Sequence, residues 1–154
     1  MNNTKTYRPF EIYILIGLLL LQVISAFGGG IAMVLKPDGS GLGIPLYILK
    51  GSPFSNFLIP GIILSIVLGV LPLIAALGLI FGKPWGVIGM LNIYTNRYWG
   101  WAYAVYTGLG LIIWITVQHI YIGYSVLQTI YQSLGIIIIV FALMPRVIKY
   151  YESN

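Results

Sequence analysis

The sequence predicts an all-α integral membrane protein: a bundle of four transmembrane helices with a long outward first loop that forms a cap. Two observations carry this prediction. Only 7% of the 154 residues are charged and 59% are hydrophobic, whereas an ordinary soluble domain carries roughly 25% charged residues. Four apolar segments, at residues 11–35, 57–81, 99–119 and 125–144, are each about as long as a helix that crosses a bilayer. The length fits one membrane domain over residues 1–154.

The first apolar segment, residues 11–35, exceeds the length needed to cross the hydrocarbon layer, so some tilt is expected. Its small residues Ser25 and Gly29 lie four apart, which would let another helix approach closely. The side chain of Gln22 falls near the middle of the membrane. We expect it to form hydrogen bonds within the protein, because a buried amide in lipid must find partners.

Residues 28–61, between the first two segments, are rich in Gly and Pro and yet stay apolar at residues 42–49 and 54–59. A flexible linker would be rich in Ser and charge instead. We therefore expect a compact cap over one end of the helices. Asp38 should form an Asx-type turn or pair with Lys36 or Lys50. The residues assigned to the cap are Asp38, Pro45, Pro53, Phe54 and Pro60.

The second segment, residues 57–81, carries two predictions that depend on proline. Ser52-Pro53 offers a helix start, with Ser as the cap residue and Pro at the first helical position. Pro72 lies deep in the segment, where it removes a backbone hydrogen bond and should kink the helix. The loop that follows contains Trp85 and Arg97, and we expect it to lie along the membrane surface.

The third segment, residues 99–119, contains the clearest helix-packing signal. Gly100, Ala104 and Gly108 recur every four residues and form a smooth stripe on one face. The connection to the fourth segment, residues 125–144, is short. The third and fourth helices should therefore be antiparallel neighbours.

The cations predict the orientation. Because Lys and Arg concentrate on the cytoplasmic side, both termini are predicted in the cytoplasm and the cap outside. The net charge of +5 is explained in the same way, and the absence of a basic run argues against a nucleic-acid partner. The termini and second loop carry six cations (Lys5, Arg8, Lys83, Arg97, Arg146, Lys149), and the first loop carries two (Lys36, Lys50).

Several short motifs lie in and around the first loop: Gly28-Gly29, Asp38-Gly39-Ser40-Gly41, Leu42-Gly43-Ile44-Pro45, Pro53-Phe54 and Pro60-Gly61. They resemble those of a known group of proteins. Trp114-Ile115 followed by Gln118 is also similar to the third helix of that group. The group consists of small uncharacterised four-span membrane proteins found in prokaryotes. The resemblance implies a four-span architecture in a prokaryotic cytoplasmic membrane, and it implies nothing about chemistry.

The sequence contains no residue pattern typical of an enzyme or a metal site. It has no cysteine, one histidine (His119) and three acidic residues. A lone histidine without cysteine or nearby carboxylates cannot build a common metal site. We therefore expect no catalytic residue, no metal and no cofactor.

Polar and aromatic residues near the outer ends of the third and fourth segments have two interpretations. The amides could form hydrogen bonds with each other and with the backbone of the cap. They could instead line a ligand pocket. Sequence alone favours the first interpretation. The residues of the candidate pocket are Trp114, Gln118, His119, Gln128 and Gln132.

Two functional hypotheses follow. The first is a non-catalytic accessory or scaffolding subunit that packs laterally in a larger membrane complex, with the stripe at Gly100, Ala104 and Gly108 and the cap as contact surfaces. The second is a binding protein for a lipid, quinone or other apolar small molecule held under the cap. Membrane lipids are expected partners in both cases, and other membrane-protein subunits in the first.

Overall fold

The computed structural model describes residues 7–82, 86–94 and 97–152, and the regular elements in these ranges are helices. The long ones are α1 (Phe10–Leu35), α5 (Trp99–Ile122) and α6 (Val126–Ala142). A further continuous segment consists of α2 (Leu58–Ser65), the π-helical turn η2 (Ile66–Val70) and α3 (Leu71–Phe81). Short elements are the 3₁₀ turn η1 (Leu46–Leu49), α4 (Gly86–Gly89) and α7 (Pro145–Tyr150).

The longer helices differ in whether they are long and apolar enough to cross a membrane. Phe10–Leu35, Leu58–Phe81 and Trp99–Ile122 are long and apolar enough to cross a membrane, and α6 is a shorter apolar helix. Three helices of this kind indicate a membrane protein. Each long helix begins and ends close to the apolar segment that predicted it, except that α5 continues to Ile122.

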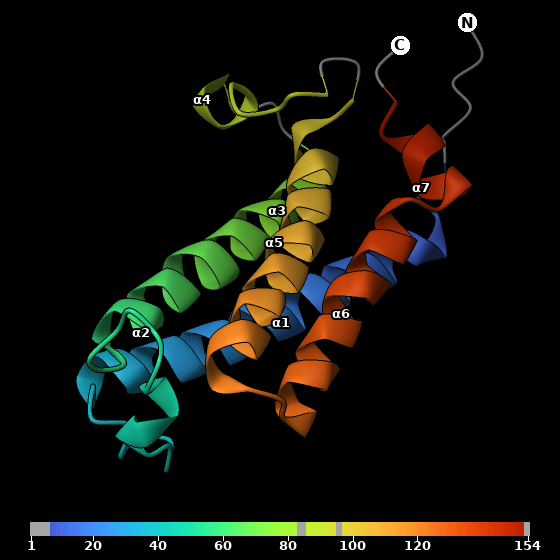
Figure 1. Cartoon of the computed structure of the whole chain (residues 1–154). Helices are drawn as coiled ribbons and strands as arrows, with labels where there is room; N and C mark the ends of the chain where they lie inside the picture. The colour runs from blue at the N-terminus through green and yellow to red at the C-terminus, as the bar shows by residue number, and fades with distance from the viewer. Residues whose placement is uncertain (1–6, 83–85, 95–96, 153–154) are drawn as a thin grey trace, which may run out of the picture.

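The long helices surround a common core (Figure 1). Helix α1 packs against α2, α3 and α6, and α5 packs against α3 and α6. Helices α5 and α6 are antiparallel neighbours, as the short connection between them predicted. The first loop, residues 36–57, and the α5–α6 connection lie at one end of the helices, and α7 lies at the other.

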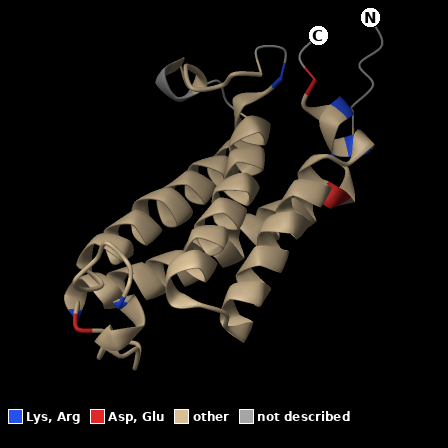
Figure 2. Ribbon diagram, in the orientation of Figure 1, with Lys and Arg blue, Asp and Glu red and all other residues tan. Residues whose placement is uncertain are grey.

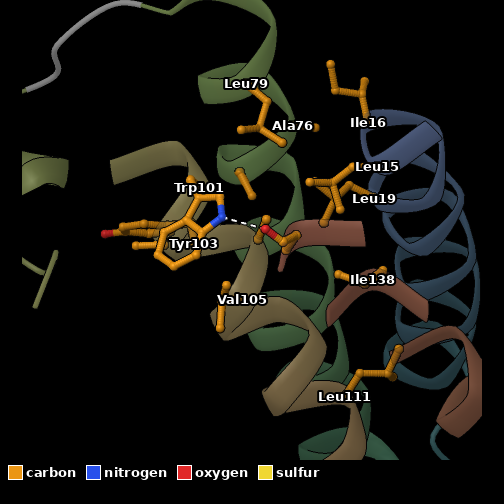
Figure 3. Close-up of a cluster of buried hydrophobic side chains, with 14 of the residues drawn as sticks. Leu15, Ile16, Leu19, Ala76, Leu79, Trp101, Tyr103, Val105, Leu111 and Ile138 are labelled. Atoms are coloured by element: carbon orange, nitrogen blue, oxygen red, sulfur yellow. Dashed lines mark hydrogen bonds between the residues drawn. The ribbon is translucent and has the colours of Figure 1, made fainter. Parts of the chain in front are cut away.

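Apolar side chains from every long helix fill this core (Figure 3). Leu15 and Leu19 of α1, Leu79 of α3 and Ile138 of α6 are fully buried. The indole Nε1 of Trp101 donates a hydrogen bond of 2.7 Å to the buried carbonyl oxygen of Ala142. This bond ties the start of α5 to the end of α6.

At each of three helix crossings, a glycine of one helix meets a glycine of the other. A Cβ atom placed on the first member of each pair would lie between 2.9 and 3.1 Å from a backbone atom of the second. Such close approach leaves no room for a side chain and lets the helix backbones contact each other directly. The pairs are Gly30 with Gly61 (α1–α2), Gly78 with Gly100 (α3–α5) and Gly108 with Gly135 (α5–α6).

The small-residue stripe predicted on α5 is therefore used inside the chain. Gly100, Ala104 and Gly108 are all buried, and the two glycines face α3 and α6. Of the small pair predicted on α1, Gly29 lies near Leu64 of α2, and Ser25 donates a hydrogen bond to the carbonyl oxygen of Gln22. The structure places none of the stripe on a free face.

The kink predicted at Pro72 stays a prediction, and the structure places the π-helical turn η2, which ends at Val70, just ahead of this proline. Proline has no N–H to donate to the carbonyl four residues earlier, that of Leu68. The side chain of Gln22 supplies the missing donor from α1, because its Nε2 lies 3.2 Å from the Leu68 carbonyl oxygen. Gln22 is buried, and its Oε1 has no hydrogen-bond partner among the described residues.

The predicted helix start at Ser52-Pro53 is wrong. Helix α2 begins at Leu58, whose N–H donates to the side chain of Asn56 at 3.0 Å. The hydroxyl oxygen of Ser52 instead accepts from the N–H of Phe54. The helix starts later because the N–H of Phe57 donates to Pro37 across the first loop, which holds this stretch outside the helix.

Tyrosine hydroxyls close the α7 end of α3. The hydroxyl of Tyr151 donates to the carbonyl oxygen of Leu79 at 3.3 Å, and that of Tyr98 donates to Gly78 at 3.0 Å. The Gly78 carbonyl also accepts from the N–H of Gly82 at 2.9 Å, whereas the Leu79 carbonyl lies in the last turn, where carbonyls lack helical partners. Both tyrosine bonds connect α3 to the chain on either side of α5 and α6. Arg8 donates to the Tyr151 hydroxyl at 3.2 Å and brings the start of α1 to the same point.

Candidate functional site

A cavity of about 500 Å³ lies where the first loop and the adjoining ends of α1 and α2 face the ends of α5 and α6. The first loop and the start of α2 form one wall, to which α1 adds Met33. The α5 end, the connection and the start of α6 form the other. The residues of the first wall are Met33, Ile44, Ile48, Leu49, Ser52, Phe54, Phe57, Pro60 and Leu64, and those of the second are Trp114, Val117, Gln118, Tyr121, Ile122, Tyr124, Ser125, Leu127 and Gln128.

The first loop is compact because its two ends are joined. The N–H of Phe57 donates to the carbonyl oxygen of Pro37 at 2.9 Å, which closes the loop just before α2. Gly39 has a φ of +82°, and a Cβ atom there would collide with the carbonyl of Ile44. Only glycine fits such a turn without strain. The buried side chains of Leu49 and Phe57 then fill the inside of the loop and contribute to the cavity wall.

Asp38 forms the Asx-type turn that the sequence predicted. Its Oδ1 accepts hydrogen bonds from the hydroxyl of Ser40 at 2.7 Å and from the backbone N–H of Ser40 at 3.0 Å. These two bonds, with the hydroxyl contributing most, lower the pKa of the Asp38 carboxyl. No ion pair of Asp38 with Lys36 or Lys50 forms in the described part of the chain.

The second wall contains two glutamine side chains that contact each other. Ser125 and Gln128 form a capping box at the start of α6, in which the Oε1 of Gln128 accepts from the N–H of Ser125 at 2.8 Å. The Nε2 of Gln128 lies 3.5 Å from the Oε1 of Gln118 on α5. The buried Gln128 thus links the two helices at the edge of the cavity.

The structure brings only part of the predicted pocket together. Trp114, Gln118 and Gln128 line the cavity, but His119 and Gln132 do not. The ring of His119 stacks on Tyr124, with ring centroids 6.0 Å apart, and its Nε2 is buried without a hydrogen-bond partner in the described ranges. Of the residues assigned to the cap, Phe54 and Pro60 line the cavity, whereas Asp38, Pro45 and Pro53 do not.

Sequence reasoning missed most of the apolar lining, including Met33, Ile48 and Leu64. Such residues look like any others in an apolar segment, so no local signal sets them apart. One signal was available for the second wall. The pattern Ser125-Val126-Leu127-Gln128 is a Ser-x-x-Gln capping box, which shows in advance that the Gln128 oxygen has a backbone partner.

The chemistry of the cavity suits binding. None of the lining residues that the structure describes is Asp, Glu, His, Lys or Arg, and five are aromatic: Phe54, Phe57, Trp114, Tyr121 and Tyr124. Among the described residues, no group of three His, Asp or Glu side chains gathers closely enough to hold a metal ion. The walls therefore offer apolar contact, aromatic rings and a small number of amide and hydroxyl groups.

Comparison of the chain with protein-family models, with curated proteins and with solved structures finds no match. The resemblance of the first-loop motifs to small four-span proteins stays a prediction.

Proposed function

We propose that the protein binds a small apolar molecule of the membrane, such as a lipid or a quinone, in the cavity beside the first loop. The cavity itself carries the proposal. Its volume of about 500 Å³ falls within the range of roughly 300–1,000 Å³ typical of small-molecule sites, which are mainly apolar and contain a few placed polar groups. The closed first loop and the capping box hold the two walls in place.

In this proposal α1, the α2–α3 segment, α5 and α6 all cross the bilayer as a four-helix bundle, and the first loop is its cap. Helix α6 has 17 residues and contains no charged side chain. At about 1.5 Å per residue it is roughly 26 Å long, against a hydrocarbon layer of about 30 Å. It packs along both α1 and α5. These features support a fourth span in spite of its short length.

The cations support an orientation with both termini in the cytoplasm and the cap outside. Among the described residues, more Lys and Arg side chains lie at the α7 end of the helices than at the first-loop end (Figure 2). Such an excess marks the cytoplasmic side. Lys5 and Lys83, which also entered the prediction, lie outside the described residues. The cations at the α7 end are Arg8, Arg97, Arg146 and Lys149, and those at the other are Lys36 and Lys50.

The other hypothesis, a non-catalytic accessory subunit of a larger membrane complex, has less support. One of its two proposed contact surfaces was the small-residue stripe on α5. That stripe is buried against α3 and α6 of the same chain. We therefore place ligand binding first.

Two tryptophan variants on α5 test the proposal. Val117 lines the cavity and is 41% exposed, so Val117→Trp should fill the cavity without disturbing the core. Ile113, one turn earlier and 62% exposed, does not line the cavity, so Ile113→Trp is the matched control. Each protein is purified in mild detergent from its membrane, and the bound molecules are extracted and identified by mass spectrometry.

We expect one apolar molecule to co-purify in similar amounts with the wild type and Ile113→Trp, and to be largely lost from Val117→Trp. Equal retention by all three proteins would place the molecule in the surrounding lipid and would overturn the proposal. Isolation of the chain only as part of a larger complex, with no bound molecule, would favour the accessory-subunit hypothesis.

A further inference from the structure

We infer that the ligand carries a carbonyl oxygen and that the side-chain amide of Gln118 donates a hydrogen bond to it. The inference rests on the proposed binding function and specifies the chemical class of the ligand. It follows from how the polar atoms on the cavity wall are already engaged.

Both amide oxygens on the wall already accept hydrogen bonds. The Oε1 of Gln128 accepts from the N–H of Ser125 at 2.8 Å, and the Oε1 of Gln118 accepts from the Nε2 of Gln128 at 3.5 Å. Each amide nitrogen carries two N–H groups. In the described part of the chain the Gln118 nitrogen donates to no acceptor, and the Gln128 nitrogen donates only to Gln118. The amide pair therefore presents donors to the cavity.

The hydroxyl groups on the wall add little to the free hydrogen-bond donors and acceptors of the amide pair. Ser52 and Ser125 are occupied with backbone groups of Phe54 and Gln128. The hydroxyl of Tyr124 accepts from Thr129. The hydroxyl of Tyr121, a lining residue whose side chain is 44% exposed, has no partner within the described ranges.

The Gln118 side chain is half-buried, and an apolar ligand that filled the cavity would cover its N–H groups. A ligand that supplies an acceptor removes the penalty for burying them unpaired. A carbonyl oxygen offers two lone pairs and no proton, so it complements the free N–H groups of the amide pair. An ammonium group would face like donors. Two sources supply a carbonyl within an apolar body: the ring of a quinone and the ester of an acyl lipid.

Two pairs of probes separate the carbonyl from the rest of the ligand. The first pair is 2,3-dimethyl-1,4-naphthoquinone and 2,3-dimethylnaphthalene, which share a ring system and differ in the carbonyls. The second is methyl dodecanoate and tridecane, which compare an ester with a plain chain. Binding to the purified full-length protein is measured by equilibrium dialysis against protein-free micelles, which corrects for partitioning into detergent.

The variants are Gln118→Met and Gln132→Met. Methionine matches glutamine in length and removes the amide, and Gln132 does not line the cavity. We expect the wild type to prefer the carbonyl-bearing member of one pair by about two- to tenfold, the effect of one net hydrogen bond. Gln118→Met should abolish this preference and leave hydrocarbon binding unchanged, whereas Gln132→Met should retain the preference. The pair that shows the preference identifies a ring or an acyl source.

Unchanged affinity of Gln118→Met for the hydrocarbon probes also shows that the variant folds with an intact cavity. If the wild type binds both members of each pair equally, and Val117→Trp blocks that binding, the carbonyl inference is wrong and the proposed function stands. The role inferred for Gln118 is likewise wrong if Gln118→Met keeps the preference. If no probe binds the wild type more tightly than it binds Val117→Trp, the proposed function itself fails.

Discussion

Replacing Gly108 by alanine should destabilise the protein, because the new methyl group has no space at the α5–α6 crossing. Its carbon would lie 2.5 Å from Cγ1 of Ile139 and 2.9 Å from the carbonyl oxygen of Gly135. Non-bonded carbon atoms prefer separations of about 3.5–4.0 Å. Ile139 can rotate away, but the carbonyl belongs to the α6 backbone, so the helices must move apart. Overpacking of this kind costs about 1–3 kcal/mol.

Gly110→Ala is the matched control on the same helix. The nearest atom to its new methyl carbon would be Cδ2 of Leu68 at 4.0 Å, which is ordinary contact. Both substitutions change the helix propensity equally, by up to about 1 kcal/mol in favour of alanine. The difference between the two variants therefore isolates the steric effect at Gly108.

The assay is unfolding of the purified proteins in mixed micelles with increasing SDS, followed by circular dichroism. We expect Gly108→Ala to unfold at a lower SDS fraction than the wild type, and Gly110→Ala to match or exceed the wild type. Equal midpoints for the two alanine variants would refute the idea that direct backbone contact holds α5 against α6.

Three further predictions concern polar contacts. Gln22→Met should lower the free energy of unfolding by about 1 kcal/mol in the wild type. The loss should be smaller in a Pro72→Ala background, where a backbone N–H can again donate to the Leu68 carbonyl. Additive losses in a double-mutant cycle would contradict this. Tyr151→Phe should lower the free energy of unfolding by about 1 kcal/mol in the same assay, because it removes the hydroxyl hydrogen bonds. Tyr150→Phe should lower it by almost nothing, since the Tyr150 hydroxyl has no hydrogen bond in the described chain. Equal losses for the two variants would contradict this prediction. The pKa of Asp38 is lower in the folded protein than its ordinary value. The Asp38 turn should therefore be stable at a pH above the ordinary pKa and loosen as the pH falls through the folded-state pKa. Amide hydrogen exchange of the first loop measures this, and Asp38→Asn should remove the pH dependence.

The agreement between sequence and structure is best for features that depend on a short stretch of chain. Apolar runs such as residues 11–35 and 57–81 became helices with nearly the predicted ends, because hydrophobic length and turn residues are local properties. The Asx turn at Asp38 was predicted for the same reason, and the π-helical turn lies just ahead of Pro72, whose missing N–H disturbs the helix locally. Each follows from the chemistry of one or two neighbouring residues.

The errors arise where a distant residue competes for the same group. Ser52 was a reasonable helix cap by its neighbours, but the bond between Phe57 and Pro37 moved the start of α2 to Leu58. Gln132 was assigned to the pocket together with Gln128, and only Gln128 lines the cavity. A residue's neighbours in the chain do not reveal such choices.

Hydrophobic composition alone was enough to determine that the chain forms long apolar helices suited to a membrane, since that property sums over each segment separately. Tertiary structure decided which small residues meet, which carbonyl Gln22 serves and where the cavity lies. These features depend on the rotation and crossing of helices that are far apart in the sequence. Close packing sets those angles through all the contacts together.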